Sequence, residues 1–494
     1  MHGGILMDFQ IKKRDWLFLL VCIGLGVLAE VSFFHGSIGV SFLVFLSGFC
    51  VVLLIRYRFS FTHNRVGILL MVCIGLLAGS YAFYDNSLFY NLNLLVVPVL
   101  LFSHIVLITS PQKLQWDTPE FLCLLKDKLG QGGVYCSAFF SKGMKEVFKN
   151  MGENTVQNVK RIAIGLLISV PLLALITGLL MSADAVFQAI ILRFPKFIFQ
   201  LDFQEQFLRL LLIVFFSLLF FSVFQVLRVK AKPVQLYDDR QKQTTSWDGI
   251  TALTILVLLN SVYVLFTVIQ FTYFFSDGLQ GGFTYAEYAR RGFFELLIAT
   301  LINWTVLTSC LKMVKVKNKG MNLALKLLYS LLIGVSGVML TSAYQRLSMY
   351  EEAYGFTFDR ILAHASMIFL MVIFAYTFIR VWMERLSLVH FYLIAGLLFY
   401  IGLNVSHIEQ IIVDQNLERY EWTEKIDINY LNSLSYTGVD GLIELYEMEP
   451  GYQGLRRILI KRQDWLEAQS DKSWQSFNIT KQRVKQRLEN LQLK

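Results

Sequence analysis

Charged residues are scarce in this sequence, and so are prolines. Only 16% of the 494 residues are charged and seven are proline, whereas 55% are hydrophobic. A disordered chain needs the opposite balance, so this composition excludes one. It also argues against a water-soluble globular protein, because many apolar runs reach the roughly 18 to 20 residues that cross about 30 Å of hydrocarbon. The sequence therefore predicts a polytopic membrane protein.

The motifs of common enzyme and cofactor sites are missing too. The six cysteines form no CxxC pair, and the seven histidines form no HxxxH, HxxH or HExxH pair. There is no GxSxG elbow, Walker loop or strand-linked GxGxxG unit. We therefore expect no metal, no cofactor and no nucleotide, and we assign no catalytic residue. Basic loops facing anionic lipid explain the net charge of +9, so no nucleic-acid partner is expected.

Eleven hydrophobic segments have the length of membrane-spanning helices. Their runs are continuous rather than alternating, which favours helices over a barrel, and a helix satisfies its backbone groups internally. The expected spans are residues 16–34, 38–55, 66–83, 88–109, 162–181, 207–227, 250–272, 292–313, 323–343, 361–382 and 388–405. The predicted fold class is an all-α membrane protein with about eleven transmembrane helices and a small extracytoplasmic helical domain.

The distribution of lysine and arginine predicts the orientation. Basic residues gather before the first span, after the second, and in the loop 110–161, all on one face. By the positive-inside rule this face is cytoplasmic. The N-terminus is then cytoplasmic and, with an odd number of spans, the C-terminus extracytoplasmic. We expect the protein in a bacterial cytoplasmic membrane, with membrane lipids as partners.

Two domains are expected, a transmembrane bundle at 1–405 and an extracytoplasmic helical tail at 406–494. The bundle contains a cytoplasmic insertion at 110–161, in which "DTPEFLCLLKDKLG" predicts a short helix lying flat on the inner leaflet. Thr118 is its expected N-cap, Pro119 its first residue, and Gly130 follows its end.

The tail has the pattern of four short amphipathic helices. Their sequences are "IDINYLNSL", "GVDGLIELYEM", "QGLRRILIKRQDWLEAQ" and "ITKQRVKQRLENL". Turn signals at Thr437–Gly438, Pro450–Gly451 and Ser470–Asp471 are expected to separate them.

Candidate site residues begin with the stretch "TYAEYARRGFFEL", which enters the eighth span. Glu287, Arg291 and Glu295 are spaced four apart on one helix side, and Arg290 stands beside them. The arginines would compensate the glutamates on a face turned away from lipid. One interpretation is a structural ion-pair network. The other leaves Arg290 or Arg291 partly free to hold an anion or a lipid head group.

A second cluster follows the ninth span, in "SAYQRLSMYEEAYGFTFDRILAH". Arg346, Tyr350 and Tyr354 recur every four residues, with Glu351 between them and Arg360 and His364 shortly after. We expect Gly355 to end one helix and Thr357 to cap the next. Both clusters are predicted on the outer face and could line one outward-open chamber. Alternatively, Arg346 snorkels to the interface and the tyrosines belong to an aromatic belt.

The seventh span carries a polar stripe. It consists of Asn260, Tyr263, Thr267 and Gln270 at spacings of three, four and three. Hydrogen bonds between helices explain such residues without any substrate, and a transport pathway is the alternative. Helices broken near the midplane would favour transport, but only Pro98 and Pro171 interrupt spans.

Several of these motifs resemble a bacterial membrane-protein family catalogued only as a domain of unknown function. The resemblance rests on "FTYAEYARRGFFEL" (283–296), "SAYQRLSMYEEAYGFT" (342–357), "DQNLERY…KIDINYLNSLS" (414–435) and "SWQSFNITKQR" (473–483). It covers roughly residues 160–485, and the first 160 residues are less similar. The family implies a many-span inner-membrane protein with an outer helical tail, and it implies no established activity.

Three functions remain open on the sequence alone. The first is binding or translocation of a small anionic or zwitterionic solute, or of a lipid head group, in the Arg/Glu/Tyr chamber. The second is a membrane scaffold or sensor whose tail at 406–494 binds envelope proteins. The third is an envelope-modifying membrane enzyme that uses Glu295 or Glu351 as a base.

Overall fold

The computed structural model describes most of the chain and confirms an all-α architecture. It describes residues 13–57, 61–112, 114–147, 203–228, 247–275, 293–468, 473–491 and 493, with isolated helical positions between 161 and 180. The chain divides into two compact units. The first comprises residues 1–70, 101–230 and 473–476, and the second comprises 71–100, 231–472 and 477–494.

Ten of the eleven expected spans are helices in the described residues. They are α1 (Lys13–Phe34), α2 (Ser41–Tyr57), α3 (Asn64–Phe83), α4 (Ser87–Thr109), α8 (Phe203–Arg228), α9 (Gly249–Phe275), α11 (Phe293–Met313), α12 (Lys319–Tyr354), α13 (Phe358–Trp382) and α14 (Leu388–Val405). Within the described part, nine are long and apolar enough to cross a membrane, and α2 is a shorter apolar helix. The expected span 162–181 lies outside the described residues, apart from isolated positions.

In the first unit, α1 and α8 pack antiparallel along their length. Asp15, near the start of α1, accepts a hydrogen bond from Gln225 near the end of α8, at 2.9 Å. Glu30, near the end of α1, pairs with Arg209 near the start of α8. Between these two polar ends the helices approach closely at Gly26, where an added Cβ would lie 2.2 Å from Ser217 Oγ. Small residues permit such approaches between membrane helices.

The insertion 110–161 holds a longer helix than the sequence predicts. Helix α5 begins at Pro119, as expected, but it runs to Val147, so the prediction that it ends before Gly130 is wrong. It packs on α8, where Phe139 is fully buried with its ring centroid 4.7 Å from that of Phe221. The absence of a side chain at Gly132 permits this packing, because a Cβ there would lie 2.7 Å from Ser222 Oγ.

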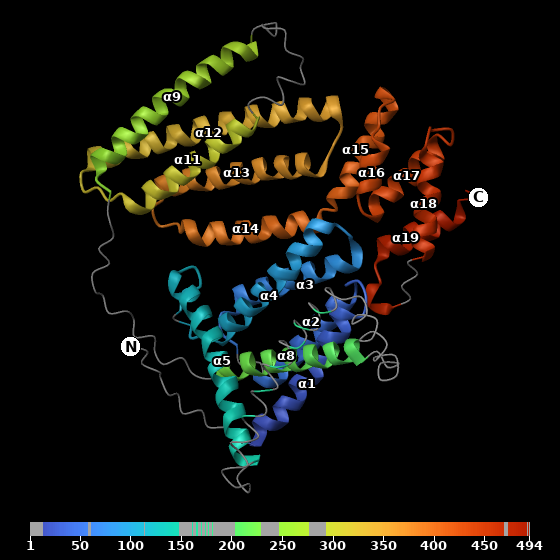
Figure 1. Cartoon of the computed structure of the whole chain (residues 1–494). Coiled ribbons are helices and arrows are strands. Elements are labelled where there is room, and N and C mark those ends of the chain that lie inside the picture. The colour runs from blue at the N-terminus through green and yellow to red at the C-terminus, as the bar shows by residue number, and fades with distance from the viewer. Residues whose placement is uncertain are drawn as a thin grey trace. The chain divides into compact units, whose positions relative to one another are not determined.

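In the second unit, α9, α11 and α13 each pack against α12, as Figure 1 shows. Their shared core contains fully buried residues such as Leu256, Leu307, Leu332 and Ala343. Helix α12 has 36 residues, about 54 Å at 1.5 Å per residue, so it extends beyond the expected span 323–343. Its last turns carry the second predicted cluster.

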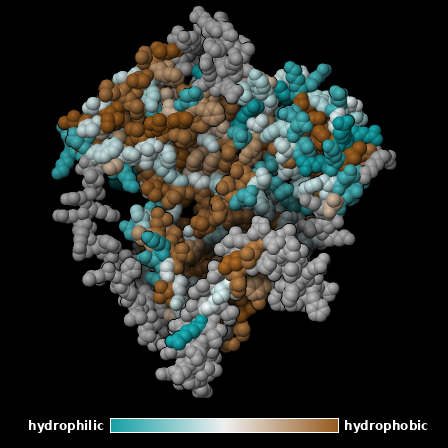
Figure 2. Space-filling view, viewed as in Figure 1, coloured by the Kyte–Doolittle hydropathy of each residue, from teal (hydrophilic) through white to brown (hydrophobic). Residues whose placement is uncertain are grey.

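The tail consists of five α-helices, and most of them share a core of their own. Its helices are α15 (Ile408–Thr423), α16 (Ile428–Ser433), α17 (Tyr436–Met448), α18 (Leu455–Ala468) and α19 (Ile479–Asn490). Buried Leu417, Leu442, Leu459 and Val484 join four of them, and Figure 2 shows hydrophilic residues over the outer surface of these helices. The short 3-10 helix η1 (Trp474–Ser476) precedes α19 in the chain and belongs to the first unit.

The four predicted tail helices are therefore present, with two corrections. Helix α15 was not predicted as a separate tail helix. Thr437 and Gly438 lie in the first turn of α17 rather than in a turn between helices. The turn at Pro450–Gly451 is confirmed, and Ser470–Asp471 lies outside the described residues.

Candidate functional sites

The end of α12 and the start of α13 bring several predicted site residues together. Gly355, with φ of 85°, ends α12 and donates its N–H to Glu351 O at 2.7 Å. The chain then turns back, and Thr357 stands at the N-cap position of α13, although its side chain makes no capping hydrogen bond. Both predicted helix boundaries are confirmed. The turn places His364 of α13 against Glu351 of α12.

Glu351 and His364 form a buried pair. Glu351 Oε2 lies 3.0 Å from His364 Nε2, and the two side chains are 5% and 12% exposed. The ring of Tyr344 meets the imidazole edge-on, with centroids 4.3 Å apart. The other carboxylate oxygen, Glu351 Oε1, is buried and accepts no hydrogen bond from the described residues. A buried carboxylate of this kind requires a nearby cation or a donor.

Two arginines stand in the same region. Arg346 is 7% exposed on α12, and Arg360 lies on the first turn of α13. Arg360 donates to Gly355 O, and its guanidinium carbon lies 4.4 Å from the ring centroid of Tyr350. The rings of Tyr350 and Tyr354 are 4.8 Å apart, with Tyr354 exposed. We call Arg346, Tyr350, Glu351, Arg360 and His364 the α12–α13 cluster.

Helix α15 of the tail holds the turn between α12 and α13 in place. Arg419 of α15 is buried and donates to Glu352 O at 2.9 Å and to Ala353 O at 2.8 Å. Asn416 exchanges hydrogen bonds with the backbone of Phe356, donating at 2.9 Å and accepting at 3.0 Å. The α12–α13 cluster therefore lies next to the contact between the apolar helices and the tail.

A second polar region connects the tail to the turn between α3 and α4. Glu409 of α15 is buried and accepts hydrogen bonds from Asn86 Nδ2, at 2.7 Å, and from Ser435. Asp85 and His407 line a small pocket with Glu409, whose cavity volume is about 20 Å³. A cavity needs roughly 10–15 Å³ to hold one water molecule, so this pocket suits water or a very small ligand.

Burial shifts the pKa values of the groups around this pocket. Burial and the nearby Glu409 carboxylate raise the pKa of Asp85 to about 6, although Lys481 acts against them. Burial also raises the pKa of Glu409, partly offset by the hydrogen bonds from Ser435 and Asn86. The pKa of His407 is lowered by burial and by Arg483. All three shifts disfavour charge at this junction.

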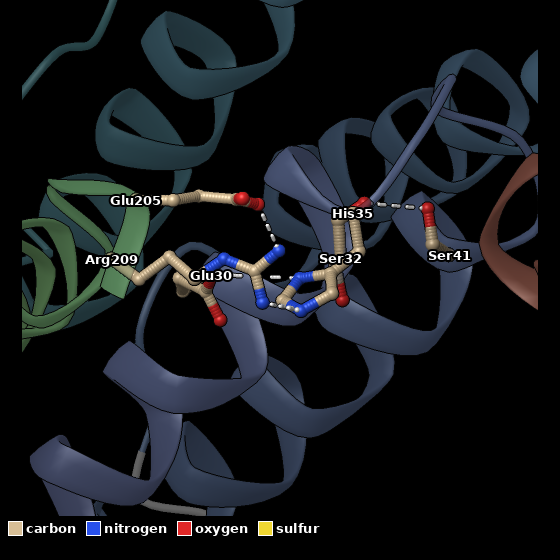
Figure 3. Close-up of polar contacts among 6 residues, drawn as sticks. All are labelled: Glu30, Ser32, His35, Ser41, Glu205 and Arg209. Carbon is tan, nitrogen blue, oxygen red and sulfur yellow. Dashed lines mark hydrogen bonds and ion pairs between the residues drawn. The ribbon is translucent and has the colours of Figure 1, made fainter. Parts of the chain in front are cut away.

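The first unit contains a polar cluster that no sequence motif predicts (Figure 3). Arg209 Nη1 lies 2.7 Å from His35 Nε2, and Arg209 Nη2 donates to Glu205 Oε1 at 2.5 Å. Glu30 Oε1 lies 3.4 Å from His35 Nδ1 and 3.8 Å from Arg209 Nε. The available signal was a charged residue inside each of two apolar runs, Glu30 and Arg209, but sequence spacing alone does not pair positions so far apart.

Other predicted residues are not brought into one site by the described structure. Glu287, Arg290 and Arg291 lie outside the described residues, as does the side chain of Gln270. Glu295 is in the first turn of α11 with its side chain exposed. The described residues contain no group of three His, Cys, Asp or Glu side chains that could hold a metal ion.

The polar stripe of α9 is partly explained by packing. Asn260 is buried and donates to Leu328 O of α12 at 3.2 Å. Tyr263 and Thr267 are half-buried. A similar contact joins α11 to α12, where Asn303 Nδ2 donates to Ser336 Oγ at 2.9 Å. Such bonds hold neighbouring helices together without any substrate.

These elements define an α-helical, multi-pass membrane protein with a folded helical tail. The chain belongs to the family described as a domain of unknown function, DUF4153, whose profile matches residues 71–445. The match starts earlier than the expected residue 160 and ends before the closing segment 473–483. It includes the α12–α13 cluster and part of the tail. No curated protein and no solved structure matches the chain.

Proposed function

We propose that this membrane protein binds a small anionic or zwitterionic solute, or a lipid head group, at the α12–α13 cluster. The observation that carries the proposal is that the cluster contains one buried and one half-buried guanidinium group. Arg346 is buried, and Arg360 is half-buried with its guanidinium carbon 4.4 Å from the ring centroid of Tyr350. A guanidinium is always charged and its planar fork matches carboxylate and phosphate groups, so this cluster suits an anionic group.

The individual side chains have distinct roles in this proposal. Arg346 and Arg360 hold the negative group of the ligand, and Glu351 orients a positive group when the ligand is zwitterionic. Tyr350 supplies an aromatic wall, already in contact with Arg360. His364, paired with Glu351, holds that carboxylate in position. The proposal rests on these described residues and does not require Glu287, Arg290 or Arg291.

The orientation is part of the proposal. The lysines and arginines of the loops favour a cytoplasmic N-terminus, which places the cluster and the tail on the outer side of the cytoplasmic membrane. The cluster would then receive its ligand from outside the cell or from the outer leaflet. Translocation would further require a route past the apolar core of α9, α11 and α12.

Native mass spectrometry in mild detergent tests the proposal. We compare the wild type with Arg346→Gln and with Lys326→Gln as a matched control. Lys326 lies on the same helix and forms an ion pair with Glu384 at 2.8 Å, away from the cluster. We expect a bound small molecule or an anionic lipid on the wild type and the control, and its loss from Arg346→Gln. The adduct mass distinguishes a solute from a lipid.

Two results would contradict this function. One is a wild-type protein that carries no adduct after mild extraction and gains none from added anionic lipids or small carboxylates. The other is an adduct retained equally by all three proteins, since the ligand would then lie elsewhere.

The tail supports a second candidate, a membrane scaffold or sensor that binds envelope proteins. The specific observation is that the tail has its own buried core and is held to the α12–α13 turn by Arg419 and Asn416. A partner bound to the tail could thereby act on the membrane helices. Deleting the tail would abolish partner recruitment under this reading, whereas Arg346→Gln would leave recruitment intact.

A further inference from the structure

The start of α19 is fixed on the end of the apolar helix α3 by buried side chains. Asn478, the N-cap of α19, donates from Nδ2 to Tyr81 O and to Tyr84 O, both at 3.0 Å. Thr480 Oγ1 donates to Phe83 O at 2.6 Å. Asn478 and Thr480 are only 8% and 7% exposed. The last carbonyl groups of a helix have no partner within it, so the tail supplies the donors that the end of α3 requires.

These hydrogen bonds determine the level of the segment relative to the membrane. Helix α3 has 20 residues, about 30 Å at 1.5 Å per residue, which matches the thickness of the hydrocarbon core. Its last residue, Phe83, therefore lies where the hydrocarbon meets the lipid head groups. Because Asn478 and Thr480 contact that end directly, the residues beside them in the chain lie at the same level.

The residues beside these donors carry apolar side chains that are exposed. Phe477 is 48% exposed and Ile479 is 38% exposed, and they alternate in the chain with the buried Asn478 and Thr480. Phe83, at the end of α3, is 50% exposed. At the boundary of a bilayer, apolar side chains such as these enter the outer part of the acyl-chain layer, where contact with lipid replaces contact with water.

An arginine follows on the same side of α19. Ile479 and Arg483 are four residues apart, so they share one face of the helix, and both are exposed. Thr480, Val484 and Leu488 form the buried face. The planar guanidinium of arginine matches a phosphate group, and a basic residue one turn from an apolar one is typical of helices that lie on anionic lipid.

We propose that the start of α19 rests on an anionic bilayer surface, with Phe477 and Ile479 among the acyl chains and Arg483 on the lipid phosphates. Under the orientation proposed above, this surface is the outer leaflet of the membrane. Lipid is the occupant because the hydrogen bonds to α3 hold the segment at the level of the head groups whether or not a partner protein is present. The inference does not depend on the ligand proposed for the α12–α13 cluster.

Spin labels on the full-length protein in lipid nanodiscs test this contact. Nitroxides are attached to Phe477→Cys, Ile479→Cys and, as the control, Arg457→Cys, each in a cysteine-free background. Arg457 is exposed at the start of α18, which lies near the other end of α19, because Arg456 Nη2 donates to Leu493 O at 3.1 Å. Collisions with oxygen report lipid and collisions with a water-soluble nickel chelate report water. The ratio of oxygen to nickel collisions should be several-fold higher at positions 477 and 479 than at 457.

Lipid composition tests the role of Arg483. The label at position 479 should lie deeper in nanodiscs that contain phosphatidylglycerol than in nanodiscs of phosphatidylcholine alone. Arg483→Gln should remove this difference, whereas Arg457→Gln should leave it unchanged.

Three results would overturn the proposal. In the first, the labels at 477 and 479 collide with nickel as often as the label at 457 does. In the second, the depth of the label at 479 is the same in both kinds of nanodisc. In the third, the labels are shielded from oxygen and nickel alike, since a protein surface, such as a second copy of this chain, would then cover the segment.

Discussion

Asn86 donates a hydrogen bond of 2.7 Å to the carboxylate of Glu409, although 323 residues separate them in the chain. Asn86 lies in the turn between α3 and α4, and Glu409 lies in the first turn of α15, just after α14. The contact requires both positions to be on one side of the membrane. The chain must therefore cross the membrane an even number of times between them.

This requirement predicts an even number of membrane spans between Asn86 and Glu409. Seven of the candidate spans in the described ranges lie between Asn86 and Glu409, namely α4, α8, α9, α11, α12, α13 and α14. The span predicted from the sequence at 162–181 would make the number eight. We expect single cysteines placed at Ser87 and Glu421, in a cysteine-free background, to react with a membrane-impermeant maleimide from the same side, which the positive-inside rule makes the outside. Labelling from opposite sides would contradict the contact and the eleven-span topology together.

Arg419 is predicted to be the main polar link between the tail and α12. It donates to Glu352 O, Ala353 O and Lys425 O, all at 2.8 to 2.9 Å. Because Arg419→Ala leaves these carbonyls without their donor, it should destabilise the attached tail by on the order of 3 kcal/mol. Hydrogen exchange of the α15 amides measures the effect. Arg457→Ala, which removes an exposed arginine from α18, should change it by less than about 0.5 kcal/mol. Equal protection in both variants would refute the role of Arg419.

The sequence predicts the membrane helices well because their signal is the length of the apolar run, which needs no tertiary information. The features that the sequence does not predict correctly have physical explanations. Gly130 is predicted to follow the end of the helix in the insertion 110–161, yet α5 continues past it because its packing on α8 uses the small residue at Gly132. Tertiary packing therefore outweighs the local tendency of glycine to end a helix.

Helix α15 was missed because its apolar residues do not gather on one face. Ile408 and Ile412 pack with Phe89 beside the apolar helices, whereas Val413 and Leu417 enter the core of the tail. A helix buried on two sides gives no amphipathic pattern. The His35–Arg209 contact was missed for another reason, since no periodicity relates residues 174 positions apart.

Gly26 and Gly24 provide a matched pair of substitutions in α1. A Cβ at Gly26 would lie 2.2 Å from Ser217 Oγ and 2.7 Å from Ile213 O, so alanine there must push α8 away. A Cβ at Gly24 meets nothing within 4 Å. Gly26→Ala should cost about 1–3 kcal/mol, as overpacking does, and Gly24→Ala should be neutral or stabilising by up to about 1 kcal/mol. Thermal unfolding in detergent compares them, and equal melting temperatures would show that α1 and α8 are not in close contact at Gly26.

The pKa of Asp85, in the pocket that it lines with Glu409 and His407, leads us to predict that this carboxyl makes the folded protein less stable as the pH rises. Asp85 has a pKa of about 6 in the folded protein against an ordinary value of 3.8, so between these values the folded state binds more protons than the unfolded state. Its favourable contribution is complete below pH 3.8 and is lost as the pH rises to about 6, a difference of about 3 kcal/mol. The raised pKa of Glu409 acts in the same direction. His407 acts in the opposite direction, because its lowered pKa costs stability as the pH falls below 6.5.

Asp85→Asn isolates the contribution of Asp85, because Glu409 and His407 are present in both proteins. The asparagine resembles the neutral carboxyl and cannot ionise, so the variant should match the wild type near pH 4 and exceed its stability near pH 7. The difference in melting temperature between variant and wild type, followed from pH 4 to pH 7.5, measures this effect. A difference that stays constant over that range would mean that Asp85 ionises as readily in the folded junction as in the unfolded chain. The carboxyl would then be hydrated, and the tail would not shield it from water where α3 meets α4.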